Sequence, residues 1–148
     1  MSKWMRVAAL MLLPAMAACS DDSDPIDSDD PAESIVMVRL NIGGQTVEIT
    51  EAGANRAVDV PRGATSLDAT FFNAAGNPVT LSSTSTYALD VVSSNTGRLT
   101  FTRTGPFSGT LNGLQTGAAT IAVSILHGGH ADFGPRNVTI NVLPATEN

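Results

Sequence analysis

The chain has 148 residues, with 8 basic and 14 acidic side chains, a net charge of −6 and a single cysteine. One cysteine excludes an intramolecular disulfide, so any folded domain must be held together by its core. The charge is uneven along the chain: residues 1–18 hold Lys3 and Arg6, residues 19–34 hold seven acids, and residues 35–148 carry six arginines against seven acids. This balance excludes the basic face that binding to nucleic acid or to anionic lipid requires.

Residues 1–18 have the three-part layout of a secretory signal peptide. Lys3 and Arg6 form a short positive region, residues 7–16 are almost wholly apolar, and two small residues precede Cys19. The apolar run is about ten residues long, whereas a helix that crosses a bilayer needs roughly twenty. The sequence therefore predicts a cleaved segment rather than a retained transmembrane anchor.

The four residues Met16-Ala17-Ala18-Cys19 resemble the lipobox of bacterial lipoproteins, in which leucine is usual where Met16 stands. The resemblance implies cleavage before Cys19 and lipidation of its thiol and its new amino group, with palmitate among the acyl chains, so that the membrane is a partner through the lipid. Lipoproteins retained at the inner membrane typically have aspartate after the cysteine, and this chain has Ser20. The resemblance thus implies an outer-membrane anchor, facing the cell surface or the periplasm. An ordinary signal peptide that happens to precede a cysteine is the alternative.

Residues 20–34, SDDSDPIDSDDPAES, contain seven acids, no base and one bulky apolar side chain, Ile26. Such a composition buries too little apolar surface to offset the entropy of ordering, so we expect residues 19–34 to be a disordered acidic linker after the lipidated cysteine. The acidic run also resembles the export tag that sends some lipoproteins to the outside of the cell. A calcium loop is the alternative, but the central glycine and terminal glutamate of an EF-hand are not in register.

A β-hairpin is predicted at the start of the folded region. Apolar residues alternate with other residues from Val36 through Val38 and Leu40 to Ile42, and the same period of two returns at residues 47–50. Gly43-Gly44 separates the two runs, which is the signature of a two-residue turn of the primed type.

Further short strands are expected along the rest of the chain, each bounded by glycine, proline, asparagine or serine. We place them at residues 57–60, 66–73, 79–81, 87–92, 99–103, 119–126 and 137–143, and we expect residues 109–114 to be a connecting piece. About seven to nine short strands without helical periodicity predict an all-β protein, a single antiparallel β-sandwich over residues 35–144 with a short tail at 145–148. The predicted core consists of Val38, Leu40, Val47, Ile49, Leu67, Phe71, Leu99, Phe101, Ile121, Val123, Ile125, Val138, Ile140 and Val142.

Residues 57–143 resemble the bacterial immunoglobulin-like domains of the Big type. The resemblance rests on Val-Pro-Arg-Gly at 60–63, on FFNAAGNPV at 71–79, on GLQTGAATI at 113–121 and on VTINV at 138–142. It implies an immunoglobulin-like sandwich that binds a protein or glycan partner without catalysis, as an adhesion or scaffold module. The sequence departs from the family where Asn73-Ala74-Ala75 replaces the usual aspartate before the turn glycine, and where the usual tryptophan strand is missing.

Both histidines of the chain lie in one segment, His127-Gly128-Gly129-His130-Ala131-Asp132. A Gly-Gly loop folds sharply enough to aim two imidazoles at one point, and His127, His130 and Asp132 are ligand types that suit Zn²⁺ or Cu²⁺. A polar turn that caps the edge of the sandwich is the alternative, because no further histidine or cysteine completes a four-ligand site. No nucleophile elbow or phosphate loop is present, so no catalytic residues and no enzymatic activity are predicted.

Two phenylalanines are candidates for contact with a partner. Phe71 and Phe72 are consecutive, so one ring must face outward from a regular strand, and Phe133 lies beside the histidine segment. An exposed ring at Phe72 or Phe133 could anchor a protein partner. Packing over the end of the sandwich is the alternative for either ring.

Overall fold

The computed structural model describes residues 35–81 and 86–145, and within them every regular element is a β-strand. No helix in this part of the chain is long and apolar enough to cross a membrane. The signal segment, Cys19 and the acidic residues of 19–34 lie outside the described residues, as do residues 146–148 of the predicted tail. The strands are β1 (Ile35–Ile42), β2 (Gln45–Thr50), β3 (Gly53–Ala54), β4 (Val58–Pro61), β5 (Gly63–Asn73), β6 (Pro78–Val79), β7 (Tyr87–Ser93), β8 (Leu99–Arg103), β9 (Ser108–Gly113), β10 (Gly117–His127) and β11 (His130–Leu143).

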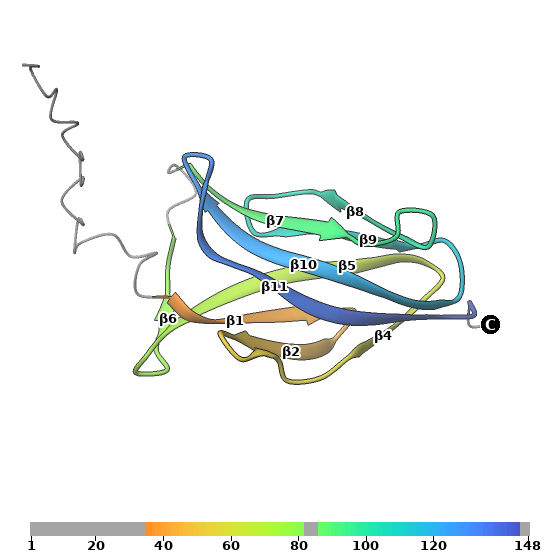
Figure 1. The fold of residues 1–148 in the computed structure, drawn as a ribbon, viewed down its shortest axis with the longest axis horizontal. Coiled ribbons are helices and arrows are strands. Elements are labelled where there is room, and N and C mark those ends of the chain that lie inside the picture. Colours follow the sequence, from red (N-terminus) through yellow and green to blue (C-terminus); the bar gives the residue numbers. More distant parts are fainter. Residues whose placement is uncertain (1–34, 82–85, 146–148) are drawn as a thin grey trace, which may run out of the picture.

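The strands form two sheets that pack face to face (Figure 1). The larger sheet has the order β3-β2-β1-β5-β9-β8, with β6 also paired to β5, and the smaller sheet has the order β4-β11-β10-β7. The predicted all-β sandwich is therefore confirmed. Pairing is antiparallel except between β4 and β11, which run parallel, so the expectation of a purely antiparallel sandwich is wrong at that one edge.

The predicted first hairpin is present, with β1 and β2 joined by Gly43-Gly44. Ile42 pairs with Gln45, and the turn glycines have φ values of 57° and 83°. A type I′ turn needs positive φ at both central residues, and only glycine adopts such angles without strain. The Gly-Gly pair therefore fixes the register of this hairpin.

The core lies between the inward faces of the two sheets. All of the predicted core residues are buried except Phe101, which is half-buried and packs against the core. Val36 does not follow the alternation of its run: a bulge in β1 between Ile35 and Met37 shifts the register, so that Ile35 is buried and Val36 is 42% exposed. The sequence pattern alone does not reveal this bulge.

The prediction of a connecting piece at residues 109–114 is wrong. Residues 108–113 form strand β9, which pairs with β5 on one side and with β8 on the other. The glycines of this stretch are typical of a loop, but here packing requires them. A Cβ at Gly109 would overlap the ring of Phe101, and a Cβ at Gly113 would lie 2.8 Å from the Pro61 carbonyl oxygen. The inward residue between them, Leu111, is fully buried.

The sandwich has two ends, which we call the near end and the far end. β1 begins at the near end, where β6 and the turn between β10 and β11 also lie (Figure 1). The far end holds the turn between β1 and β2, the connections from β4 to β5 and from β9 to β10, and the last residues of β11. The described chain thus enters at one end and finishes at the other.

Candidate functional site

The histidine segment forms the turn between the two longest neighbouring strands of the smaller sheet, at the near end. β10 ends at His127, β11 begins at His130, and the two histidines are paired directly across the hairpin. Gly128 and Gly129 have φ values of 57° and 94°, the positive angles that a two-residue primed turn requires. β11 begins much closer to the histidines than the sequence indicated, at residue 130 rather than at 137, whereas β10 ends within one residue of its predicted end.

Asp132 reaches His127 because of a bulge in β11. Ile125 pairs with Phe133 and Leu126 pairs with Ala131, which leaves Asp132 as an extra residue on the β11 side. A bulge of this kind redirects the side chain of the extra residue. The Asp132 Oδ2 atom lies 3.5 Å from His127 Nδ1, and the two side chains are 21% and 39% exposed.

Tyr87 completes the surroundings of His127. β7 pairs with β10 so that Tyr87 lies opposite His127, and the two rings stack with centroids 4.1 Å apart and planes 23° from parallel. Tyr87 is buried and belongs to the core cluster. The His127 ring is therefore fixed by an aromatic ring on one side and a carboxylate at its Nδ1 edge, an arrangement that orients an imidazole.

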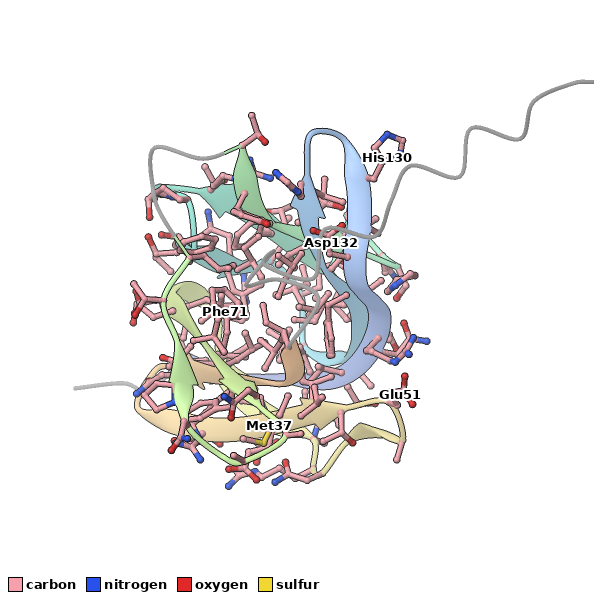
Figure 2. The ribbon with its side chains drawn as sticks, turned by 90° about the vertical axis from the view of Figure 1, so that its left-hand side faces the viewer. Met37, Glu51, Phe71, His130 and Asp132 are labelled. Carbon is pink, nitrogen blue, oxygen red and sulfur yellow. The ribbon has the colours of Figure 1, made fainter. Side chains whose placement is uncertain are left out.

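The structure brings together His127 and Asp132 but does not add His130 to form a set of three ligands. His130 is exposed and lies at the tip of the hairpin, and Asp132 lies nearer to the body of the sandwich (Figure 2). Among the described residues, no three His, Cys, Asp or Glu side chains are placed to hold one metal ion. The geometry of this part of the chain matches an ordered polar turn, and metal binding stays a prediction.

Neither candidate phenylalanine offers the exposed ring that the sequence suggested. Phe133 is 6% exposed and belongs to the core cluster. Phe72 does face away from Phe71, as a regular strand requires, but it is only 8% exposed, because the Arg39 guanidinium lies 4.4 Å from its ring centroid. Arg39 is held there by Glu48, whose Oε1 accepts from Nη2 at 2.8 Å and from Nε at 3.2 Å.

A cleft opens beside the histidine hairpin at the near end, with a volume of about 690 Å³. One wall comes from Ile35 and Val36 at the start of β1, and another from the turn after β2, which includes Glu51. The third wall is the start of β11, with Phe133, Asp132 and Arg136 among its residues. Figure 2 views this end of the molecule and labels Glu51, in the turn after β2, and Asp132, in β11.

Arg136 is the cation of this cleft. Its Nη1 donates to the Pro135 carbonyl oxygen at 3.2 Å, its guanidinium lies 5.9 Å from the Phe133 ring centroid, and its buried Nε has no hydrogen-bond partner in the described structure. The cleft therefore combines an apolar wall with one cation and two carboxylates. That chemistry suits a ligand with both charges, such as a peptide segment, and sequence reasoning missed it because Glu51 and Arg136 are 85 positions apart.

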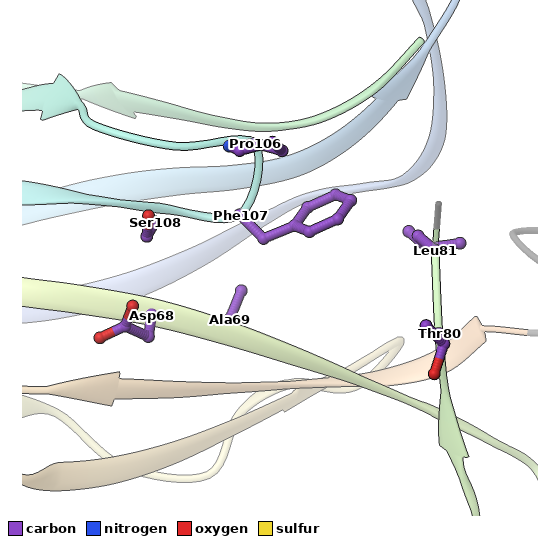
Figure 3. A pocket seen from close by; sticks show the side chains of 7 residues that line it. All are labelled: Asp68, Ala69, Thr80, Leu81, Pro106, Phe107 and Ser108. Atoms are coloured by element: carbon purple, nitrogen blue, oxygen red, sulfur yellow. The ribbon is translucent and has the colours of Figure 1, made fainter. Parts of the chain in front are cut away.

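A second depression lies beside β5 and the end of β6 (Figure 3). It has a volume of about 660 Å³ and is lined by Asp68 and Ala69 of β5, by Thr80 and Leu81 after β6, and by residues 106–108. The Phe107 ring packs edge-on against Phe71, with centroids 4.9 Å apart. The floor of the depression is therefore formed by a ring that packs on the core, and the depression does not gather charged side chains as the first cleft does.

These features define an all-β sandwich with a fixed polar hairpin at one end. No protein-family model and no curated protein matches the chain. Among solved structures, the chain is similar to domains 4 and 5 of the S-layer protein SbsC, at 23% sequence identity and a TM-score of 0.41. The match covers 68% of this chain and 60% of that chain, so the chain spans less than two thirds of the length of this neighbour.

Proposed function

We propose that the chain is a lipid-anchored protein of the bacterial outer membrane, and that its sandwich is a non-enzymatic binding or scaffold module. The lipobox-like residues 16–19 and the acidic segment 20–34 support the anchor and the linker. The main support for the role of the sandwich is the position at which the described chain enters it. The described chain enters at the near end, so an anchor at Cys19 leaves the loops of the far end free of the attachment.

The interior of the sandwich supports a structural role. Within residues 35–81 and 86–145 the buried residues are almost all hydrophobic, and only Thr65 and Ser124 are polar among them. The polar contacts of the described residues are on the surface, where the pair of Arg39 and Glu48 and the pair of His127 and Asp132 fix strands and turns. An apolar interior with ordered polar pairs on the surface is the chemistry of a scaffold that presents its surface to a partner.

The anchor is tested by metabolic labelling with a palmitate analogue, followed by fractionation of the membranes. We expect the wild-type chain to carry label and to sediment with outer membranes. Cys19→Ala should lose the label and become soluble, and the neighbouring Ser20→Ala should keep both properties. Label that persists in Cys19→Ala would refute the proposal. Protease treatment of intact cells then distinguishes the cell surface from the periplasmic side.

A further inference from the structure

The far end of the sandwich carries exposed leucines. Of the four large hydrophobic residues that are exposed among the described residues, Leu114 and Leu143 lie at this end, with 43% and 46% of their surface accessible. Leu114 follows the last residue of β9, and Leu143 is the last residue of β11. The other two, Val36 and Val92, belong to β1 and β7 and lie elsewhere.

The backbone brings the two leucines to the same place. Gly113 packs so closely on the crossing from β4 to β5 that a Cβ there would lie 2.8 Å from both the Pro61 carbonyl oxygen and Val142 Cγ1. The Arg62 N–H donates to the Leu143 carbonyl oxygen at 3.0 Å. Leu114, Leu143 and Arg62 therefore surround one contact point, and we call this group, together with Arg98, the far-end patch.

The far-end patch is positively charged. The segments that build this end, residues 43–44, 61–63, 94–98, 113–118 and 142–145, contain Arg62 and Arg98 and no acidic residue. Arg98 is tied to the patch, since its carbonyl oxygen accepts from the Leu114 N–H at 2.7 Å and its Nη1 donates to the Ala118 carbonyl oxygen at 2.6 Å. The nearby Asp59 accepts from Asn141 Nδ2 at 2.8 Å. Arg62 and Arg98 outnumber Asp59 at this end, so an acidic partner that also brings apolar surface to cover the leucines fits the patch.

We propose that the far-end patch binds the acidic segment 20–34 of a second copy of this chain. That segment has seven carboxylates and no base, which complements the two arginines, and its single bulky apolar residue, Ile26, lies between acidic residues. Leucines favour such a peptide over a glycan, because glycans are usually held by aromatic platforms. This inference rests on the proposed scaffold role and names its partner.

Ile26 of the same copy is at the limit of its reach to the patch. Asn73, which pairs with Ile35, lies ten residues along β5 from Gly63 at the far end, and ten strand residues span about 33 Å. Ile26 lies nine residues before Ile35, and a fully extended chain of that length covers at most about 32 Å. To bring Ile26 to the patch of its own copy, the chain between Ile26 and Ile35 would need to be fully extended. The segment of a neighbouring copy can approach the patch without that requirement.

The contact joins two different surfaces, the far-end patch of one copy and the acidic segment of the next. A contact of this kind is heterologous, and repeated from copy to copy it builds rows or rings. Because each acidic segment leaves from a near end, successive sandwiches would lie head to tail. A lipid at each Cys19 would hold such a row against the membrane.

The test is self-association of residues 20–148, which lack the lipidated cysteine, followed by sedimentation velocity over a wide range of protein concentration. We expect association that weakens at high salt, because charge contacts on a surface are screened. Asparagine in place of the segment's aspartates, or Ile26→Ser, should abolish it. Arg62→Gln should weaken it by about two- to five-fold, the range expected for an exposed charge pair. The matched control Arg103→Gln removes the same charge from the near-end half of β8 and should leave association unchanged.

The leucines are tested in the same way. Leu114→Ser with Leu143→Ser should weaken association by about tenfold through lost apolar burial, whereas Val92→Ser, which removes a more exposed apolar side chain from β7, should not. A chain that stays monomeric, or associates equally well with Arg62→Gln and both leucine changes, would overturn the inference. These outcomes are independent of lipid labelling at Cys19, so the inference and the proposed anchor fail separately.

Discussion

Gly134 lies in the bulged start of β11, and its replacement by alanine should destabilise the domain strongly. Its φ is 85°, an angle that costs alanine about 1–2 kcal/mol. In addition, a Cβ at this position would collide with the Val123 carbonyl oxygen and would lie 3.1 Å from the Ser124 Cα atom. Backbone atoms of the neighbouring strand cannot move aside as a side chain can, and overpacking of this kind costs about 1–3 kcal/mol more. We therefore expect a total loss of about 2–5 kcal/mol.

Gly76 provides the matched control. Its φ is 76°, close to that of Gly134, but a Cβ there has no atom within 4 Å. Gly76→Ala should therefore lose only the conformational part, about 1–2 kcal/mol. Urea unfolding of residues 20–148, followed by circular dichroism and by the fluorescence of the single tyrosine, measures both variants. The reasoning fails if Gly134→Ala is no less stable than Gly76→Ala, because the collision with β10 would then carry no free energy.

Three further changes test the core, the covered ring and the hairpin. Leu40→Ala should lower the free energy of unfolding by about 2–5 kcal/mol, because the side chain is fully buried, and a loss below 1 kcal/mol in a urea titration would contradict the core assignment. Arg39→Ala should lower the free energy of unfolding by about 1 kcal/mol because it uncovers Phe72. Glu48→Gln keeps the guanidinium over the ring and should cost less. Equal losses would show that the ion pair, rather than the contact with the ring, stabilises the domain. Saturating Zn²⁺ should move the melting midpoint by less than about 2 °C, since among the candidate ligands that the structure describes only His127 and Asp132 approach each other. A rise of about 10 °C that is lost in His127→Ala would instead establish a metal site.

Local patterns predicted most of the strands. Alternation with a period of two identifies strands because successive side chains of a strand point to opposite faces, and the inward sets at residues 121–125 and 138–142 are buried as expected. The same rule failed at Val36 and at β9. At Val36 a bulge interrupts the alternation, and in β9 the inward positions Gly109 and Gly113 are glycines that make room for neighbours. Both failures depend on residues far away in the sequence.

The candidate site was predictable in part. The sequence places His127, His130 and Asp132 around one turn, and the Gly-Gly pair predicts how sharp that turn is. It gives no sign of Tyr87, which meets His127 only because β7 pairs with β10 in one register. Nor does it reveal that Phe133 is buried, because that depends on the two bulges at the start of β11.

The sequence by itself determined the class of fold, the first hairpin and almost all of the core, because those follow from side-chain alternation and turn chemistry over a few residues. Only the tertiary structure decided which strands lie side by side, and with it the parallel edge of β4 and β11 and the double pairing of β9. It also decided that Arg62, Leu114 and Leu143 meet at one end. The physical reason is that pairing and register are set by the packing of the whole core, so residues that are distant in the chain become neighbours only when both sheets are closed.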